Sequence, residues 1–359
     1  MKRRFLLLAV SWLGPALAGR ASTLPPLASD SPQVRRVRVL PVPTVGYAPE
    51  TSTFGGVVAL FTLHLHPTAR VSNAKIKATY TARRQSILEL GWNYFFKDER
   101  AFSRGTVQLS RYPDLYYGIG AATPATAETN YTSDRVLVRL EMLWRLSPRR
   151  PLFLGPQLRY TSFGRLGYLG GDAPTFAKLY PARAAGLGLT LLADTRTNLL
   201  NPSTGLYAEL GASQNQTQAG GYQRLTADLR RYHTWHGCVL AAQLASTAVL
   251  GPAPFYDYAL LGGPQARGYF YGRFRDRAIT SLQGEVRSPQ WHRWGLAAFG
   301  GVSQLSPSGS WLHGPGLKPN VGTGVRFLAD RKEHVNLRLD YAWGADGQRG
   351  LYIAFGEAF

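Results

Sequence analysis

The stretch VNLRLDYAW, residues 335–343, alternates strictly between two kinds of side chain. Its odd-numbered positions are apolar or aromatic: Val335, Leu337, Leu339, Tyr341 and Trp343. Its even-numbered positions are polar, charged or small: Asn336, Arg338, Asp340 and Ala342. Because successive side chains of a strand point to opposite faces of a sheet, this pattern predicts a strand with one apolar face and one ionic face.

Alternation of this kind recurs in about sixteen segments, with a mean length of about ten residues, which is what a tilted strand needs to cross a bilayer. The predicted strands are residues 37–47, 54–65, 74–83, 86–96, 104–111, 130–144, 152–162, 184–194, 205–214, 222–234, 237–250, 278–288, 294–304, 320–329, 334–343 and 349–358.

Two architectures fit such strands: a soluble sandwich with its apolar faces inside, or a membrane barrel with its apolar face toward lipid. The even number of segments and their length favour the barrel. Aromatic residues also gather near segment ends, at residues 92–96, at residues 291–294 and at Trp343, as in interfacial girdles. We therefore predict an all-β fold, a sixteen-stranded antiparallel transmembrane β-barrel with a polar interior.

The N-terminus has the pattern of a secretory signal peptide. Lys2, Arg3 and Arg4 precede an apolar run at residues 5–17, which is too short to span a membrane, and a small-x-small cleavage site ends at Ala18. The sequence thus predicts a signal peptide at 1–18, a Pro/Ser-rich periplasmic tether at 19–36 and the barrel at 37–359.

The formal net charge is +20, and arginine supplies 34 of the 41 basic residues. Planar guanidinium groups suit carboxylate and phosphate partners. In an exported chain these partners are anionic lipids and lipopolysaccharide rather than nucleic acid.

No motif for catalysis, cofactor binding or metal binding stands out. Neither a G-x-S-x-G nor an H-E-x-x-H stretch is present, and His64 and His66 have no third ligand beside them. Cys238 is the only cysteine, so no disulfide can form within the chain. We predict no enzyme, no cofactor and no metal.

One long connection lacks any strand period: LLGGPQARGYFYGRFRD, residues 260–276, between the eleventh and twelfth segments. Its GGPQARGYFYGRFRD, followed by QGEVRSP, resembles the sixth extracellular loop and twelfth strand of the BamA/TamA-like surface-antigen barrels, which are outer-membrane assembly and secretion pores. LPVPTVGYAPETSTFGGV at 40–57 is similar to the opening of these barrels, and LYIAFGEAF to their closing strand with its C-terminal Phe359. DTRTNLLNPSTGLY at 194–207 resembles their periplasmic turn, through Asp194, Arg196, Asn201, Pro202 and Gly205.

The resemblance implies a location in the outer membrane of a Gram-negative bacterium and a loop folded into the lumen. Arg267, Gly268 and Tyr269 would then form the loop tip. Alternation places a set of charged residues on the inward face, where they would form the docking wall: Glu285, Arg287, Arg326, Arg338 and Asp340. A buried arginine needs a carboxylate, and we expect Glu285 first and Asp340 second as the partner of Arg267. The alternative is an ordinary solvated pore wall.

Two features depart from the family pattern. Gly301 and Ser303 stand where the thirteenth strand usually carries the Asp and Gly of F-x-D-x-G. The short stretch before the first predicted strand also leaves no room for periplasmic POTRA domains, so we predict a form without them.

The resemblance implies insertion or translocation of protein or lipid through a lateral seam between the first and last strands. Unfolded outer-membrane proteins or lipids would be its clients, with an unidentified periplasmic or lipoprotein partner. The predicted seam carries residues that form poor ladders: Pro41, Pro43, Gly350 and Gly356. The alternative is a plugged passive pore or a structural surface antigen without a client; a lipid hydrolase would need a nucleophile that is not evident.

Overall fold

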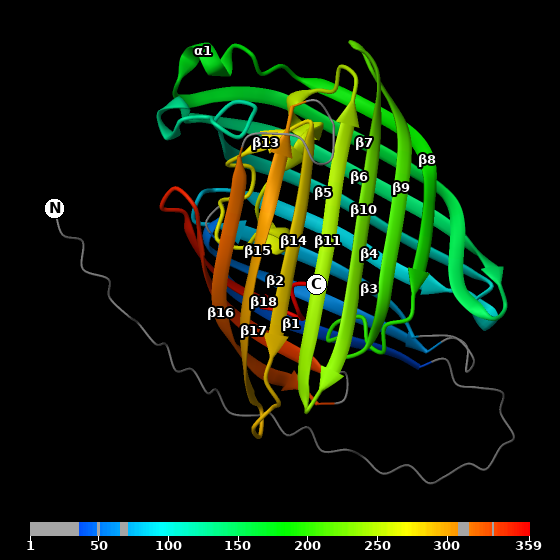
Figure 1. The fold of residues 1–359 in the computed structure, drawn as a ribbon. Helices are drawn as coiled ribbons and strands as arrows, with labels where there is room; N and C mark the ends of the chain where they lie inside the picture. The colour runs from blue at the N-terminus through cyan, green and yellow to red at the C-terminus, as the bar shows by residue number, and fades with distance from the viewer. Residues whose placement is uncertain (1–35, 49–50, 65–70, 308–315, 332–333) are drawn as a thin grey trace, which may run out of the picture. The chain divides into compact units, whose positions relative to one another are not determined.

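The alternating segments form one sheet of sixteen antiparallel strands (Figure 1). The computed structural model describes residues 36–48, 51–64, 71–307, 316–331 and 334–359. The strands of this sheet are β1 (Arg36–Ala48), β2 (Ser52–His64), β3 (Ser72–Thr81), β4 (Ser86–Phe95), β5 (Ala101–Tyr116), β6 (Thr129–Ser147), β7 (Arg150–Gly171), β8 (Ala182–Asp194), β9 (Gly205–Thr217), β10 (Gly220–Trp235), β11 (Cys238–Leu250), β14 (Ala278–Arg287), β15 (Trp294–Ser306), β16 (Leu317–Asp330), β17 (Val335–Gly344) and β18 (Arg349–Phe355).

Each strand pairs with the next in chain order, from β1 to β11 and then from β14 to β18. Between β11 and β14 the chain forms a two-stranded ladder of its own, β12 (Ala259–Leu260) with β13 (Arg275–Asp276). In the connections that the structure describes lie four single-turn 3-10 segments and the short helix α1 (Ala173–Phe176). Among the described residues, no helix is long and apolar enough to cross a membrane.

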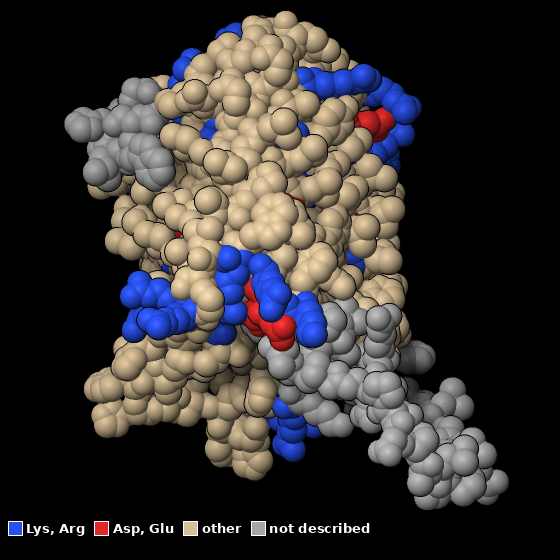
Figure 2. Space-filling view, turned by 90° about the vertical axis from the view of Figure 1, so that its right-hand side faces the viewer, with Lys and Arg blue, Asp and Glu red and all other residues tan. Residues whose placement is uncertain are grey.

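Burial follows the alternation that the sequence shows. On β8, Leu187 is 68% exposed and Leu189 57% exposed, whereas Thr190 is fully buried. Figure 2 shows the outcome on one face of the barrel: uncharged residues cover most of it, between a few Lys and Arg at the top and a charged cluster lower down. Apolar side chains thus cover the outside and polar side chains the inside, as a bilayer requires. The prediction of a sixteen-stranded antiparallel barrel is confirmed.

The two ends of the barrel differ. We call the end where β1 begins and β18 ends the terminal rim, and the opposite end, where the chain at 251–277 leaves the sheet, the loop rim. β3 and β4 have ten residues each, whereas β6 has 19 and β7 has 22, so the loop rim is uneven. β7 extends beyond the predicted 152–162. Its last nine residues, FGRLGYLGG at 163–171, pair with β6 although four of them are glycines.

The junction between β1 and β18, which we call the seam, differs from all the others. The two strands approach each other, but among the described residues no ladder joins them, whereas a ladder joins every consecutive pair around the sheet. β1 carries Pro41 and Pro43, and its ladder to β2 runs unbroken through both, as Pro41↔Ala59 and Pro43↔Val57.

The last strand is shorter than predicted. β18 ends at Phe355, and Gly356 follows with a φ of 77°, so the segment 349–358 is not one continuous strand. Gly350 lies within β18, opposite Ala342 of β17. Placing Gly356 in the closing strand was therefore wrong: its left-handed backbone turns the chain away from the sheet.

Several predictions of the N-terminal region lie outside the described residues. These are the signal peptide at 1–18 and the tether at 19–36, except for Arg36, which begins β1. His66 lies outside them too. Within the described part of the chain, no group of three or more His, Cys, Asp or Glu side chains could hold a metal ion.

Candidate functional site: the docked loop

The connection between β11 and β14 is buried. Tyr269 is fully buried and Phe274 nearly so, and both pack in an apolar cluster with Leu261, Ile279 and Leu305. Figure 1 shows this yellow segment between the front strands and the rear strands. A connection on a protein surface would expose its backbone and side chains to water, so this one is held by the barrel wall.

Arg267 is the most deeply set charged residue of the loop, with 1% of its surface exposed. Its Nη1 donates to Asp340 Oδ2 at 2.7 Å, and its Nη2 donates to Glu285 Oε2 at 2.6 Å. The guanidinium also lies over the ring of Phe299, 3.4 Å from the centroid. The planar guanidinium of Arg267 thus joins Glu285 of β14 to Asp340 of β17, and it stacks on the ring of Phe299 in β15.

Three arginines of the wall hold these carboxylates in place. Arg326 Nη1 donates to Asp340 Oδ1 at 2.5 Å and its Nη2 to Glu285 Oε1 at 3.4 Å. Arg287 Nε donates to Glu285 Oε1 at 2.7 Å, and Arg338 Nη1 to Asp340 Oδ2 at 2.7 Å. Both oxygens of each carboxylate are therefore paired with guanidinium groups, which offsets the free-energy cost of burying the two negative charges.

The glycine of the tip is required by its backbone. Gly268 has a φ of 107°, and a Cβ built on it would lie 2.7 Å from the backbone carbon of Trp343. Its N–H donates to the hydroxyl of Tyr352 at 2.9 Å. The loop backbone therefore lies directly against the end of β17 and bonds to a side chain of β18, a close approach that a side chain at position 268 would prevent.

Tyr269, the residue after Gly268, anchors the loop tip through its hydroxyl group. Its hydroxyl donates to the carbonyl oxygen of Pro319 at 2.6 Å and accepts from the N–H of Ala345 at 2.8 Å. Burial raises the pKa of Tyr269 above its ordinary value, so the phenol keeps the proton that it donates. A Cβ on Gly344 would lie 2.7 Å from the Tyr269 ring, so the strand end leaves space for this side chain.

We expect Gly268→Ala to lower the free energy of unfolding by about 2–4 kcal/mol, because left-handed strain adds to a backbone clash. The temperature at which the barrel loses its compact mobility on an SDS gel measures this. Gly347→Ala is the control, since Gly347 also has a positive φ of 71° but open space at the Cβ. Equal losses in the two variants would contradict close packing at the tip.

The chain after β18 enters the same network. Glu357 Oε2 accepts from Arg326 Nε at 2.8 Å, and Glu357 Oε1 accepts from Asn336 Nδ2 at 2.7 Å. Phe359 is buried against Tyr232 and Ala241, and its carbonyl oxygen accepts from Arg287 Nη2 at 3.1 Å. The resemblance placed Phe359 at the end of the closing strand, whereas β18 ends at Phe355 and residues 356–359 turn inward at the terminal rim. There Glu357 has cationic partners, which the lipid side would not provide.

Replacing Glu357 with glutamine should lower the free energy of unfolding by about 1–3 kcal/mol, since Arg326 loses a charged acceptor but keeps Asp340. Urea denaturation in detergent measures the change. Glu99→Gln serves as the control because Glu99 faces Arg145 at 3.7 Å, in a looser pair at the same rim. No loss relative to this control would contradict a structural role for the inserted end.

The predicted turn at 194–207 lies beside this network. Asp194 Oδ1 accepts from Arg196 Nε at 2.9 Å, and Gly205 has a φ of 111° with no space for a Cβ. The carbonyl oxygen of Pro202 accepts from Arg287 Nη1 at 3.1 Å. The turn, the inserted chain end and the loop wall therefore meet at Arg287. The side chain of Asn198 caps a tight turn, its Oδ1 accepting from the backbone N–H of Asn201 at 3.0 Å.

The opposite side of the lumen is hollow and rich in arginine, a feature that the sequence analysis missed. Arg104 bridges Glu141 at 2.5 Å and Glu209 at 2.7 Å, and Arg139 contacts Glu209 at 2.6 Å. A cavity of about 850 Å³ lies at this cluster, and a second of about 680 Å³ lies beneath the loop. Thr106 and Arg139 line both.

Comparison with solved structures places this architecture among known barrels. BamA from Haemophilus ducreyi lacking POTRA domains 1-3 is similar over 90% of this chain and 70% of its own, with a TM-score of 0.56 and 13% identity. CdiB from Acinetobacter baumannii is similar over 90% of this chain and 65% of its own, with a TM-score of 0.58 and 9% identity. This chain therefore spans about two thirds of the length of either structure. At such identities the likeness shows the fold alone.

Sequence comparison gives the family. No curated protein sequence matches the chain. Residues 70–359, most of the chain, match the Omp85 superfamily domain. With this match and with the docked loop, the sixteen strands and the apolar exterior in place, the chain belongs to the Omp85 superfamily of outer-membrane β-barrels.

Proposed function

We propose that this barrel aids the insertion or translocation of protein or lipid at the outer membrane, and that the client passes through the seam. One observation carries the proposal: among the described residues, β1 and β18 share no ladder, while all consecutive strands do. Unpaired backbone groups facing lipid are costly, so such a seam favours pairing with an incoming strand.

The residues at the seam support this reading. Pro41 and Pro43 have no N–H to donate, and their ladder to β2 is unbroken. Their missing donors therefore weaken pairing on the free side of β1. Gly350 offers no side chain to pack on β18, and Gly356 ends the strand early. A junction opens easily when few hydrogen bonds join its two strands. These prolines and glycines reduce the number of hydrogen bonds that β1 and β18 can form.

The docked loop adds a second line of support. It crosses the lumen beside β14–β18 and is held by Arg267, so a straight path along that side of the barrel is closed. A client that cannot pass along the axis has to leave sideways. In this proposal the loop is a plug that keeps the membrane sealed. The protein performs no chemical step and needs no cofactor.

The clients in this proposal are unfolded outer-membrane proteins or lipids, delivered with a periplasmic or lipoprotein partner. Deleting the gene in its host and comparing outer-membrane proteomes and lipid composition tests it. We expect specific barrel proteins or lipids to decrease, and to recover when the intact gene is restored. An unchanged outer membrane in the deletion strain would overturn the proposal.

The second candidate function is a passive pore. The hollow side of the lumen favours it, because the two cavities of about 850 Å³ and 680 Å³ share Thr106 and Arg139. Planar bilayer recordings of the purified barrel distinguish the two. Steady conductance with an unchanged outer membrane in the deletion strain would favour the pore.

A further inference from the structure

A groove of about 710 Å³ crosses the outer surface of β2–β6 near the loop rim. Its outward-facing residues fall into two rows that follow the ladder register from strand to strand. The row nearer the β3–β4 turn is Gly55, Tyr80, Ser86, Arg111 and Asp134. The row nearer the middle of the barrel is Val57, Ala78, Leu88, Leu109 and Val136.

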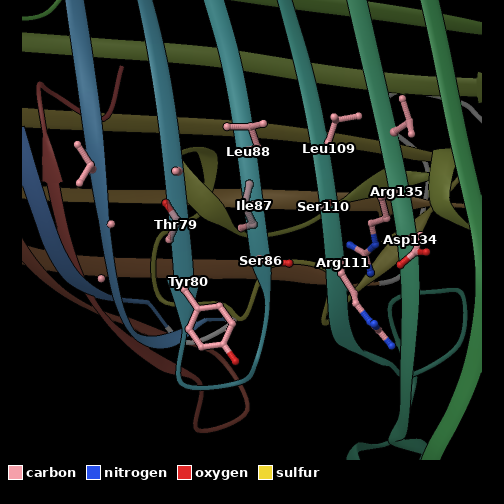
Figure 3. A pocket seen from close by; sticks show the side chains of 15 residues that line it. Thr79, Tyr80, Ser86, Ile87, Leu88, Leu109, Ser110, Arg111, Asp134 and Arg135 are labelled. Carbon is pink, nitrogen blue, oxygen red and sulfur yellow. The ribbon is translucent and has the colours of Figure 1, made fainter. Parts of the chain in front are cut away.

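Figure 3 shows both levels of the groove. Leu88 and Leu109 lie side by side on β4 and β5, and Tyr80 and Arg111 lie nearer to the β3–β4 turn. The two rows are two residues apart along each strand, a separation of about 7 Å. The groove is therefore polar at the rim and aliphatic toward the middle, the same order in which a lipid presents its headgroup and its chains.

Small residues make this surface hollow. Ala78 lies directly between Val57 and Leu88 in the register, and Tyr80 lies between Gly55 and Ser86. Val57, Leu88 and Leu109 remain about half exposed. A hydrocarbon chain can thus lie over Ala78 with these side chains around it, which buries more apolar area than a flat wall would.

Arg111, the cation at the rim, has no acidic partner in the part of the chain that the structure describes. Arg111 lies opposite Asp134 in the β5–β6 register. The Asp134 carboxylate pairs instead with Arg165 at 2.8 Å, and no carboxylate of the described residues forms an ion pair with Arg111. Arg84 is also exposed, in the adjoining β3–β4 turn, whereas the guanidinium of Arg83 lies over the ring of Phe270 in the docked loop, 5.6 Å from the centroid. The rim of the groove therefore presents Arg111 beside one carboxylate that is already paired, with Arg84 in the adjoining turn.

We propose that this groove binds a phosphorylated glycolipid of the leaflet at the loop rim, that is, lipopolysaccharide. A phosphate accepts from Arg111 and from the hydroxyls of Tyr80 and Ser86, while an acyl chain covers Ala78 between Val57 and Leu88. Arg111 and Arg84 together suit a headgroup with more than one phosphate better than a singly charged phospholipid. The site is independent of the seam and of any client, so it stands whether or not the proposed function does.

Native mass spectrometry of the purified full-length barrel tests the site, with Kdo2-lipid A and phosphatidylglycerol as probes. We expect Kdo2-lipid A to bind, and Arg111→Gln to weaken this binding about tenfold, as a single charged hydrogen-bonded contact would. Ala78→Trp, which fills the groove without changing its charge, should weaken it by a similar factor.

Arg183→Gln is the matched control, because Arg183 is likewise exposed and lies at the loop-rim end of β8, outside the groove. Each variant is first shown to have the heat-modifiable gel mobility of a folded barrel. Equal affinity in Arg111→Gln, Ala78→Trp and the control would overturn the site. Tighter binding of phosphatidylglycerol than of Kdo2-lipid A would overturn the assignment to lipopolysaccharide.

Discussion

Replacing Arg267 with alanine is expected to release the loop from the barrel wall and to lower the free energy of unfolding by about 3 kcal/mol. The loss stays at the low end for a broken buried ion pair because Glu285 keeps Arg287, and Asp340 keeps Arg326 and Arg338. The stacking on Phe299 is lost as well. Protease cleavage within residues 262–276 and the thermal shift in gel mobility measure the two effects.

Arg267→Lys separates charge from geometry. A lysine keeps the positive charge, but its single ammonium cannot reproduce a planar fork shared by Glu285 and Asp340. We expect it to recover less than half of the lost stability. Arg183→Ala, an exposed arginine on β8, should leave the loop protected. A loop that stays protected in Arg267→Ala would show that the apolar cluster around Tyr269 and Phe274 holds it without the ion pairs.

Locking the seam should abolish function in the proposed role. In a Cys238→Ser background, cysteines at positions 43 and 45 of β1 are combined with cysteines at 351 and 353 of β18, and the pair that forms a disulfide is kept. Oxidation then prevents β1 from separating from β18, so activity should disappear and return on reduction. Complementation of the deletion strain with and without reductant is the measurement.

A second disulfide supplies the control for this experiment. Ala59 of β2 and Ile76 of β3 lie directly opposite each other in a continuous ladder, so cysteines there cross-link strands that need not separate. Oxidation of this pair should leave function intact. Full activity with the seam locked would instead support the passive pore or structural role.

The strands were predictable because alternation is a local property. The predicted strand 334–343 agrees with β17 to within one residue at each end, because each of its side chains faces either the lipid or the lumen. The predicted strand bounds are wrong where the side chains no longer alternate. Residues 163–171 pair within β7 although their glycines and lost alternation gave no signal, and a single left-handed glycine at 356 redirects the chain end.

The candidate site was predictable only in part. Alternation placed Glu285 and Asp340 on the inner face, and the family resemblance directed Arg267 toward them. Neither could identify Phe299, Tyr352 or Glu357, because alternation gives the face of a residue and not its height along the barrel. The missing aspartate at Gly301 is explained by packing: a Cβ there would lie 2.6 Å from the Leu282 carbonyl oxygen.

The docked loop also has a consequence for the order in which the barrel folds. Arg267 contacts Glu285, 18 residues onward, and Asp340, 73 residues onward, while Gly268 contacts Tyr352, 84 residues onward. β14, β17 and β18 are thus gathered by one segment, although β14 is not a ladder neighbour of β17 or β18. We therefore expect the last strands to assemble around the loop, and we expect β1 and β18 to meet last, because the loop has to be enclosed before the barrel closes.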